Sequence, residues 1–181
     1  MPLPKEQYKY TIDDILALPE GERAELLDGK IYDMAPPTAT HQFILFELSL
    51  TIGTFIKNNK GSCQVALAPF AVFLNDDNQN YVEPDLSVIC NPSQIDDKGC
   101  HGAPDWIIEI VSPSSERMDY VVKTFKYRTA GVREYWVIDK TLKKVTVFDF
   151  ENDNMFEYDF TQKIPVLIYD GELEIDLSKF V

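Results

Sequence analysis

The sequence predicts a mixed α/β (α+β) fold in which a β-sheet is flanked by two main helices and preceded by an N-terminal β-hairpin. Apolar residues recur at helical spacing in two long segments, and these segments separate shorter apolar runs typical of strands. Two of the short runs are apolar at nearly every position, as in strands buried on both faces of a sheet. We find no internal repeat, low-complexity tract or linker, so we expect one domain over residues 1–181.

The chain is expected to begin with a short helix and a hairpin. Thr11 can cap the helix, which Pro19 to Gly21 ends. Asp28-Gly29 stands between two runs that contain apolar residues. This dipeptide is a strong hairpin signal, because both central residues of the turn need a positive φ. Pro36-Pro37 closes the second strand.

Two further segments define the first helix of the core and the strand after it. Thr38 or Thr40 can cap a helix that runs to about Asn58, with apolar residues at helical spacing. A strand is expected over 65–74, where Pro69 suggests a sheet edge or a bulge.

The second half of the chain is expected to carry most of the sheet. Short apolar strands are predicted at 86–90 and 106–111. Ser112-Pro113-Ser114-Ser115 stops the second of these and caps a helix over 115–130, and Gly131 suits the left-handed position after it. Three successive strands of a meander follow at 134–139, 144–150 and 155–160.

Composition narrows the class of protein. Hydrophobic residues make up 45% and charged residues 26%, as in soluble globular proteins. The apolar stretch 43–56 contains Glu47 and is too short to cross a bilayer, and the first residues lack the apolar core of a signal peptide. We therefore expect a cytoplasmic protein without membrane contact.

The three cysteines, Cys63, Cys90 and Cys100, are an odd number and contain no CxxC pair. We therefore expect reduced thiols rather than a disulfide or a zinc site.

The net charge of -13 opposes nonspecific binding to nucleic acid. The charge is unevenly distributed, however. Residues 114–145 contain eight Lys and Arg residues against four acids, whereas 151–181 contain two against eight. A solvated helix face followed by an acidic end would give the same pattern.

Two carboxylates stand in otherwise apolar strands. Asp85 begins the strand 86–90, and Glu109 lies inside Trp106-Ile107-Ile108-Glu109-Ile110-Val111. A buried carboxylate costs several kcal/mol unless it is paired or binds a metal. Two acids on adjacent strands can converge on one hard cation such as Mg²⁺. Acids paired with Lys or Arg at the end of the sheet would explain the pattern equally well.

A third element favours the metal site. Asp119, Lys123 and Tyr127 are spaced i, i+4, i+8 on the helix that follows Glu109, so they share one face. An ammonium there could orient a water or stabilise charge on a transition state. An exposed Asp–Lys pair is the alternative.

The order and spacing of these motifs resemble the Uma2 family (DUF820) of restriction-endonuclease-like proteins, a branch of the PD-(D/E)XK nuclease superfamily. The resemblance covers roughly residues 10 to 160. The motifs that carry it are Glu25-Leu26-Leu27-Asp28-Gly29, His41, Pro84-Asp85-Leu86-Ser87-Val88, Gly102-Ala103-Pro104-Asp105, Glu109-Ile110-Val111-Ser112-Pro113-Ser114-Ser115, Asp119, Lys123, Tyr127 and Ala130-Gly131-Val132-Arg133-Glu134-Tyr135-Trp136-Val137-Ile138-Asp139.

The resemblance implies a restriction-endonuclease-like sheet and a Mg²⁺- or Mn²⁺-dependent endonuclease that hydrolyses phosphodiester bonds in DNA. Asp85, Glu109 and the carbonyl of Ile110 would ligate the metal, and Lys123 would position or activate the attacking water. The chain departs from the superfamily pattern at Val111, where a lysine is expected. In this branch that lysine is expected on the following helix, which matches Lys123.

Two further residues have open roles. Glu25 resembles the upstream acid of the superfamily and could hold a second metal or orient a water, or it is an exposed acid of the hairpin. His41 could contact a substrate phosphate or shuttle a proton, or it is a capping or surface residue. Tyr127 is expected to pack rather than to act in catalysis, and Trp106, Tyr135 and Trp136 are expected in the core.

The resemblance also suggests a homodimer, since two-fold symmetry suits cleavage of two strands, and no organic cofactor. The alternative function is a nuclease fold with weak or lost catalysis that binds nucleic acid or a protein partner. The missing strand lysine and the charge of -13 motivate it. A third possibility is an interaction protein unrelated to nucleic acid, with the acids in salt bridges.

Overall fold

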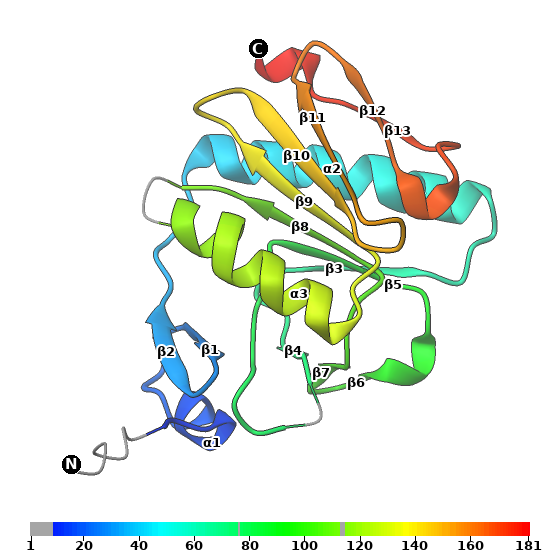
Figure 1. The fold of residues 1–181 in the computed structure, drawn as a ribbon. Coiled ribbons are helices and arrows are strands. Elements are labelled where there is room, and N and C mark those ends of the chain that lie inside the picture. Colours follow the sequence, from blue (N-terminus) through cyan, green and yellow to red (C-terminus); the bar gives the residue numbers. More distant parts are fainter. Residues whose placement is uncertain (1–8, 76, 113–114) are drawn as a thin grey trace.

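The computed structural model describes residues 9–75, 77–112 and 115–181 (Figure 1). At its centre is one six-stranded sheet with the order β11-β10-β9-β8-β5-β3. Its strands are β3 (Gln64–Leu67), β5 (Leu86–Ile89), β8 (Trp106–Ile110), β9 (Glu134–Asp139), β10 (Lys144–Asp149) and β11 (Asn154–Asp159). β8 and β9 are parallel, and the other neighbours are antiparallel. The predicted mixed α/β fold is confirmed.

Helix α2 (Ala39–Asn58) covers one face of this sheet. Its N-cap is Thr38, whose side chain accepts a hydrogen bond from the backbone N–H of His41. Ile44, Leu48 and Ile52 are completely buried against strand residues of the same core cluster. The C-terminal elements complete this side: β12 (Lys163–Pro165), η3 (Leu167–Tyr169), β13 (Glu174–Asp176) and η4 (Ser178–Phe180).

By length and composition alone, α2 is long and apolar enough to cross a membrane. The stretch considered too short in the sequence is therefore part of a longer helix, of 20 residues. The inward face of α2 belongs to the protein's own core, because Ile44, Leu48 and Ile52 pack beneath the sheet.

The opposite face of the sheet carries a helix made of two parts. Met118–Lys123 (η2) is a π-helix, and it continues into α3 (Thr124–Ala130), which ends at Gly131 with a φ of 99°. Residues 116 and 117 are also helical, so the whole helix spans 116–130, close to the predicted 115–130, with a π-helical segment in its middle. Pro113 and Ser114, which were expected to stop the preceding strand and cap this helix, lie outside the described residues.

The N-terminal region forms smaller units beside the sheet (Figure 1). Helix α1 (Ile12–Leu16) precedes the hairpin β1 (Ala24–Leu27) and β2 (Lys30–Asp33). Asp28 and Gly29 have φ values of 52° and 75°, as the hairpin signal requires.

A separate three-stranded sheet lies in the middle of the chain. It contains β4 (Val72–Phe73), β7 (Gly99–His101) and β6 (Ile95–Asp96), and η1 (Pro92–Gln94) precedes β6.

The predicted single strand 65–74 is wrong. Its residues form two strands, β3 and β4, which belong to different sheets. The break contains Pro69, whose nitrogen has no hydrogen to donate to a sheet ladder.

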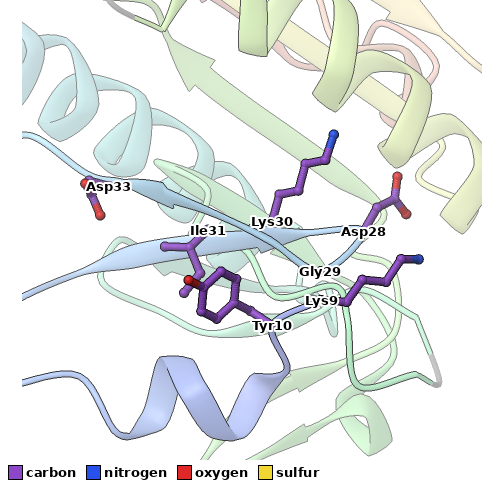
Figure 2. A pocket seen from close by; sticks show the side chains of 7 residues that line it. All are labelled: Lys9, Tyr10, Asp28, Gly29, Lys30, Ile31 and Asp33. Atoms are coloured by element: carbon purple, nitrogen blue, oxygen red, sulfur yellow. The ribbon is translucent and has the colours of Figure 1, made fainter. Parts of the chain in front are cut away.

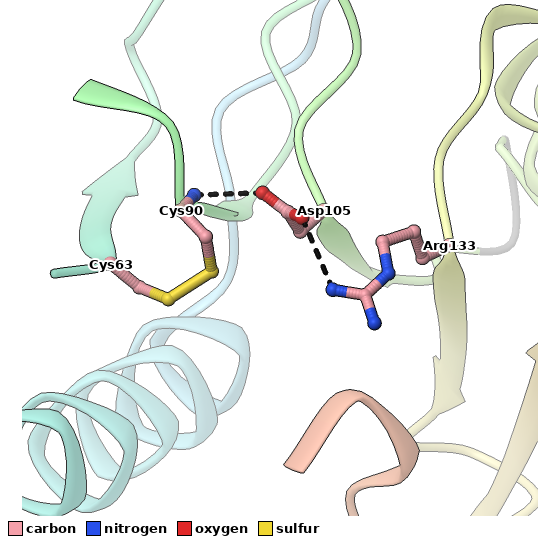
Figure 3. Close-up of a disulfide and its surroundings, with 4 residues drawn as sticks. All are labelled: Cys63, Cys90, Asp105 and Arg133. Atoms are coloured by element: carbon pink, nitrogen blue, oxygen red, sulfur yellow. Dashed lines mark hydrogen bonds and ion pairs between the residues drawn. A yellow bond between two sulfur atoms is a disulfide. The ribbon is translucent and has the colours of Figure 1, made fainter. Parts of the chain in front are cut away.

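The expectation of reduced thiols is also wrong for two of the three cysteines. Cys63 and Cys90 form a disulfide, with Cα atoms 3.8 Å apart (Figure 3). Gln64 pairs with Ile89 in the antiparallel ladder of β3 and β5, so the next residues outward, Cys63 and Cys90, come to face each other. This register is a long-range property that cysteine counting does not reveal. Cys100 is free and buried.

Candidate functional site

Asp85 and Glu109 lie side by side at one end of the β5–β8 ladder. Leu86 pairs with Ile108, so Asp85 and Glu109 stand directly opposite each other. The backbone N–H of Asp85 donates to Oε2 of Glu109 at 3.4 Å, and the N–H of Ile110 donates to Oδ2 of Asp85 at 2.7 Å. The two acids that the sequence pattern singled out are thus neighbours on adjacent strands.

Lys123 lies among three carboxylates. Its Nζ is 2.8 Å from Oε2 of Glu25, 2.9 Å from Oε1 of Glu109 and 3.7 Å from Oδ1 of Asp119. All four side chains are buried, with the lysine residue only 5% exposed. The predicted Asp119–Lys123 pair is therefore not a surface pair. It is part of a buried cluster that joins β1, β8 and η2.

Burial and charge perturb this cluster strongly. Burial raises the pKa of Glu109 well above its usual value; the ammonium of Lys123 opposes this, and Asp85, Asp119 and Glu25 add to it. Burial likewise raises the pKa of Asp119. Burial would lower the pKa of Lys123, but the surrounding carboxylates outweigh it and hold that pKa well above its usual value. Lys123 therefore keeps its proton, and the burial of Glu109 and Asp119 is offset in part by its positive charge.

Glu25 comes from the hairpin but is not exposed. It is 4% exposed, and Oε1 accepts a hydrogen bond from the backbone N–H of Glu83 at 3.1 Å. Together with its contacts to Lys123, this makes the reading of Glu25 as an exposed hairpin acid wrong.

Tyr127 completes the surroundings of Glu109. Its hydroxyl donates to Oε1 of Glu109 at 2.8 Å, and its side chain is fully buried. Burial raises the pKa of Tyr127 well above its usual value, so the hydroxyl keeps its proton. Tyr127 thus packs in the core, as predicted, and also holds a site carboxylate. Trp106, Tyr135 and Trp136 are fully buried, as predicted.

His41 approaches the same pair of acids from the start of α2. Its Nε2 lies 3.0 Å from Oδ2 of Asp85, and the residue is 7% exposed. Its Nδ1 is buried without a hydrogen-bond partner among the described residues. His41 is neither a surface residue nor the cap of the helix, a role that belongs to Thr38.

A cavity of about 430 Å³ opens onto this cluster. Its walls come from the hairpin, the start of α2, the ends of β5 and β8, and η2. The charged residues that line it are Arg23, Glu25, Asp33, His41, Asp85, Glu109, Asp119, Lys123 and Lys140. Sequence reasoning missed Arg23 and Lys140 as cavity residues. No sequence pattern marks Arg23 as a site residue. Lys140 directly follows the motif 130–139, which does not include it.

The described parts of the chain contain no group of three or more His, Cys, Asp or Glu side chains arranged to hold a metal ion. Asp85 and Glu109, which stand opposite each other on adjacent strands, supply two carboxylates. Any metal at this site would therefore take few ligands from side chains.

A second hollow, of about 400 Å³, lies at the hairpin and is shown in Figure 2. It contains none of the predicted site residues. The residues that line it are Lys9, Tyr10, Asp28, Gly29, Lys30, Ile31 and Asp33. Its two lysines and two aspartates balance in formal charge. Asp28 also forms an ion pair with Lys126.

Comparison with known proteins gives consistent matches. Residues 12–177 match the family model Uma2, described as a putative restriction endonuclease. An uncharacterized protein of Synechocystis sp. (strain ATCC 27184 / PCC 6803 / Kazusa) is 26% identical over 133 residues, which cover 73% of this chain and 68% of the relative. A crystal structure described as a putative nuclease belonging to DUF820, from Anabaena variabilis ATCC 29413, has a TM-score of 0.76 and 25% identity, covering 94% of this chain and 96% of that chain.

Proposed function

The chain belongs to the Uma2 family of putative restriction endonucleases, and from that membership we propose that it is a metal-dependent endonuclease that hydrolyses phosphodiester bonds in DNA. The observation that carries the proposal is the pair Asp85 and Glu109. They stand opposite each other on adjacent strands, at the wall of a cavity and next to a buried ammonium. This is the combination of hard oxygen ligands and fixed positive charge that phosphodiester hydrolysis needs.

The donor set fits one Mg²⁺ or Mn²⁺ ion. Five carboxylates (Glu25, Asp33, Asp85, Glu109 and Asp119) line the cavity against the cations Arg23, Lys123 and Lys140, so the lining carries an excess of negative charge. Asp85, Glu109 and the Ile110 carbonyl would hold the ion. Mg²⁺ is commonly bound by one or two carboxylates together with waters and substrate phosphates. When bound, the ion would lower the pKa of a water and polarise the phosphate.

The chain's own residues then have separate roles. The ammonium of Lys123 orients the attacking water and stabilises negative charge on the phosphate oxygens. Glu25 and Asp119 position that ammonium, so in this proposal Glu25 acts through Lys123 rather than on a second metal.

Asp85 and Glu109 also have positioning neighbours. His41 holds Asp85 through Nε2, and Tyr127 holds Glu109 through its hydroxyl. Such outer contacts orient the groups that bind a metal. We therefore assign His41 a positioning role in place of the proton shuttle considered from the sequence.

An activity assay tests the proposal. Purified full-length protein is incubated with supercoiled, linear and single-stranded DNA, with Mg²⁺, with Mn²⁺ and with a chelator. We expect metal-dependent cleavage that Asp85→Asn abolishes, while Asp96→Asn, an exposed acid on β6, leaves it unchanged. Absence of metal-dependent cleavage on every DNA form, or equal cleavage by Asp85→Asn, would contradict it.

A second candidate function is a nuclease fold that binds nucleic acid or a protein without catalysis. It is favoured by Val111 at the position of the strand lysine and by the net charge of -13. It predicts binding that survives Glu109→Gln and no cleavage by the unmodified protein. The same assay separates the two.

We also propose a homodimer without an organic cofactor. Phe43, Phe46 and Leu50 are more than half exposed on the outer face of α2, and large exposed apolar side chains are frequent at interfaces. Sedimentation analysis of the unmodified protein and of Phe46→Glu checks this. A single monomeric species in the sedimentation of the unmodified protein would contradict the proposed homodimer.

A further inference from the structure

We propose that Lys140 is a binding residue for a phosphate of the nucleic-acid backbone, next to the cleavage site. This inference rests on the proposed function and names a contact that its catalytic residues do not supply. The cations that line the cavity are Arg23, Lys123 and Lys140.

Two of these cations already have carboxylate partners. Arg23 pairs with Glu83 through both Nε and a terminal nitrogen, and Lys123 lies among three acids. Lys140 instead donates to the backbone carbonyl of Val111, at 2.7 Å. No carboxylate lies within ion-pair distance of Lys140 in the described chain, so its charge is available to an anion in the cavity.

The fold fixes Lys140 at the rim of the site. β8 and β9 run parallel, and the N–H of Val111 donates to the carbonyl of Ile138. The residues that follow the two strands therefore leave the sheet at the same end. Asp139 accepts hydrogen bonds from the N–H groups of Thr141 and Leu142, both at 2.8 Å, which fixes the turn that carries Lys140. The side chain is half-buried, so little conformational entropy remains to be lost when an anion binds.

The ligand chemistry follows from the rest of the cavity. Five carboxylates line it, and the whole chain has a charge of -13, so an isolated anion gains little there. A phosphodiester chain differs, because one phosphate can reach the metal-binding pair while a neighbouring phosphate reaches Lys140. A phosphate contact of this kind positions the strand without reading its sequence.

Salt-dependent binding tests the inference. Affinity of the full chain for a fluorescein-labelled DNA duplex is measured by anisotropy over a series of salt concentrations, without divalent metal so that no cleavage interferes. Loss of one phosphate contact lowers the magnitude of the log–log slope by about 0.9, which is about an eight-fold weaker affinity at 0.1 M salt. We expect this of Lys140→Gln and near-normal behaviour of Lys140→Arg.

The matched control is Lys163→Gln, which removes the same charge from an exposed position on β12. Equal slopes for Lys140→Gln and Lys163→Gln would overturn the inference, since net charge alone would then explain the change. A further arm uses inorganic phosphate. Saturable phosphate binding that Lys140→Gln abolishes, with an unchanged DNA slope, would also overturn it and point to a site for free phosphate.

The two proposals fail separately. Metal-dependent cleavage combined with equal slopes for the two glutamine variants rejects only the role of Lys140. A slope change specific to Lys140→Gln without any cleavage rejects the endonuclease and keeps the nucleic-acid contact.

Discussion

Glu109 and Glu134 are both buried glutamates in apolar strands, and β8 and β9, which carry them, are neighbours in one sheet. Their partners differ in kind. Glu109 faces an ammonium, a tyrosine hydroxyl and other acids. Glu134 accepts hydrogen bonds from the indole of Trp136 at 2.6 Å and from the N–H of Ile168 at 2.8 Å.

Burial raises the pKa of both carboxyl groups, but different groups oppose it. For Glu134 the opposing contacts are neutral donors, the N–H of Ile168 and the indole of Trp136. For Glu109 the opposing group is a cation, and other acids add to the rise. A buried acid is therefore not by itself the mark of a site. Glu134 fastens the C-terminal segment to the sheet, whereas Glu109 belongs to a cluster with unbalanced charge.

The largest expected effect separates the two acids by activity. Glu109→Gln should lower metal-dependent cleavage on the order of 10³-fold, because a ligand of the proposed ion and a partner of Lys123 are lost together. Glu134→Gln, which keeps an acceptor oxygen and lies outside the cavity, should cut at nearly the normal rate. Single-turnover cleavage of labelled DNA measures both. Equal losses of cleavage in the two variants would show that Glu109 and Glu134 do not differ in function.

The second prediction concerns the cation beside Glu109. Lys123→Met should reduce the free energy of unfolding by about 3–5 kcal/mol, because breaking a buried ion pair leaves uncompensated buried charge. Arg128→Met is the control, since its pair with Asp153 is exposed and should be worth at most about 1 kcal/mol. Urea unfolding of the metal-free proteins gives both values. Similar losses in the free energy of unfolding for the two variants would show that the buried cluster contributes no more to stability than the exposed ion pair does.

The third prediction tests the anchoring role of Glu134. Glu134→Ala leaves the indole of Trp136 and the N–H of Ile168 without their acceptor, so we expect a loss of about 1–3 kcal/mol in the free energy of unfolding. Hydrogen exchange should accelerate at Ile168. The exposed Glu157→Ala on β11 should stay within about 0.5 kcal/mol of the unmodified protein. Unchanged exchange at Ile168 would argue against the anchor.

The smallest effect is expected from Tyr127→Phe, which removes one hydrogen bond to Glu109 and keeps the ring packed. The expected cost is about 1 kcal/mol in the free energy of unfolding. Calorimetric titration with Mn²⁺ should also show weaker binding, because Tyr127 holds a carboxylate proposed to bind the metal. An affinity equal to that of the unmodified protein would limit Tyr127 to packing.

The same comparison shows how far the sequence predicts the site. The apolar run around Glu109, the Asp28-Gly29 turn and the Asp119–Lys123–Tyr127 spacing are local patterns, and each predicted its structure. Glu134 lies in an equally apolar run, and no local pattern distinguishes it from Glu109. The two glutamates differ in their partners: Ile168 for Glu134 and Lys123 for Glu109. Both partners belong to other elements of the structure.

Long-range pairing explains what the sequence did not predict. Glu25 and Lys123 meet across 98 positions, and Cys63 meets Cys90 only because of the β3–β5 register. The division of 65–74 between two sheets depends on which strands are available to pair on each side of Pro69. Lys140 gains its place from the parallel alignment of β8 with β9, which residue periodicity does not specify.

The disulfide has one more consequence, for the connectivity of the chain. Cys63 and Cys90 close a covalent ring that contains Asp85 and the exposed residues Asp77 and Asn78. A protease that cuts between Asp77 and Asn78 would open the ring but leave the two fragments joined by the disulfide. The nicked protein would run as one species on a non-reducing gel and as two after addition of a thiol. Within this ring, Asp85 stays covalently joined to both halves of the protein after such a cut.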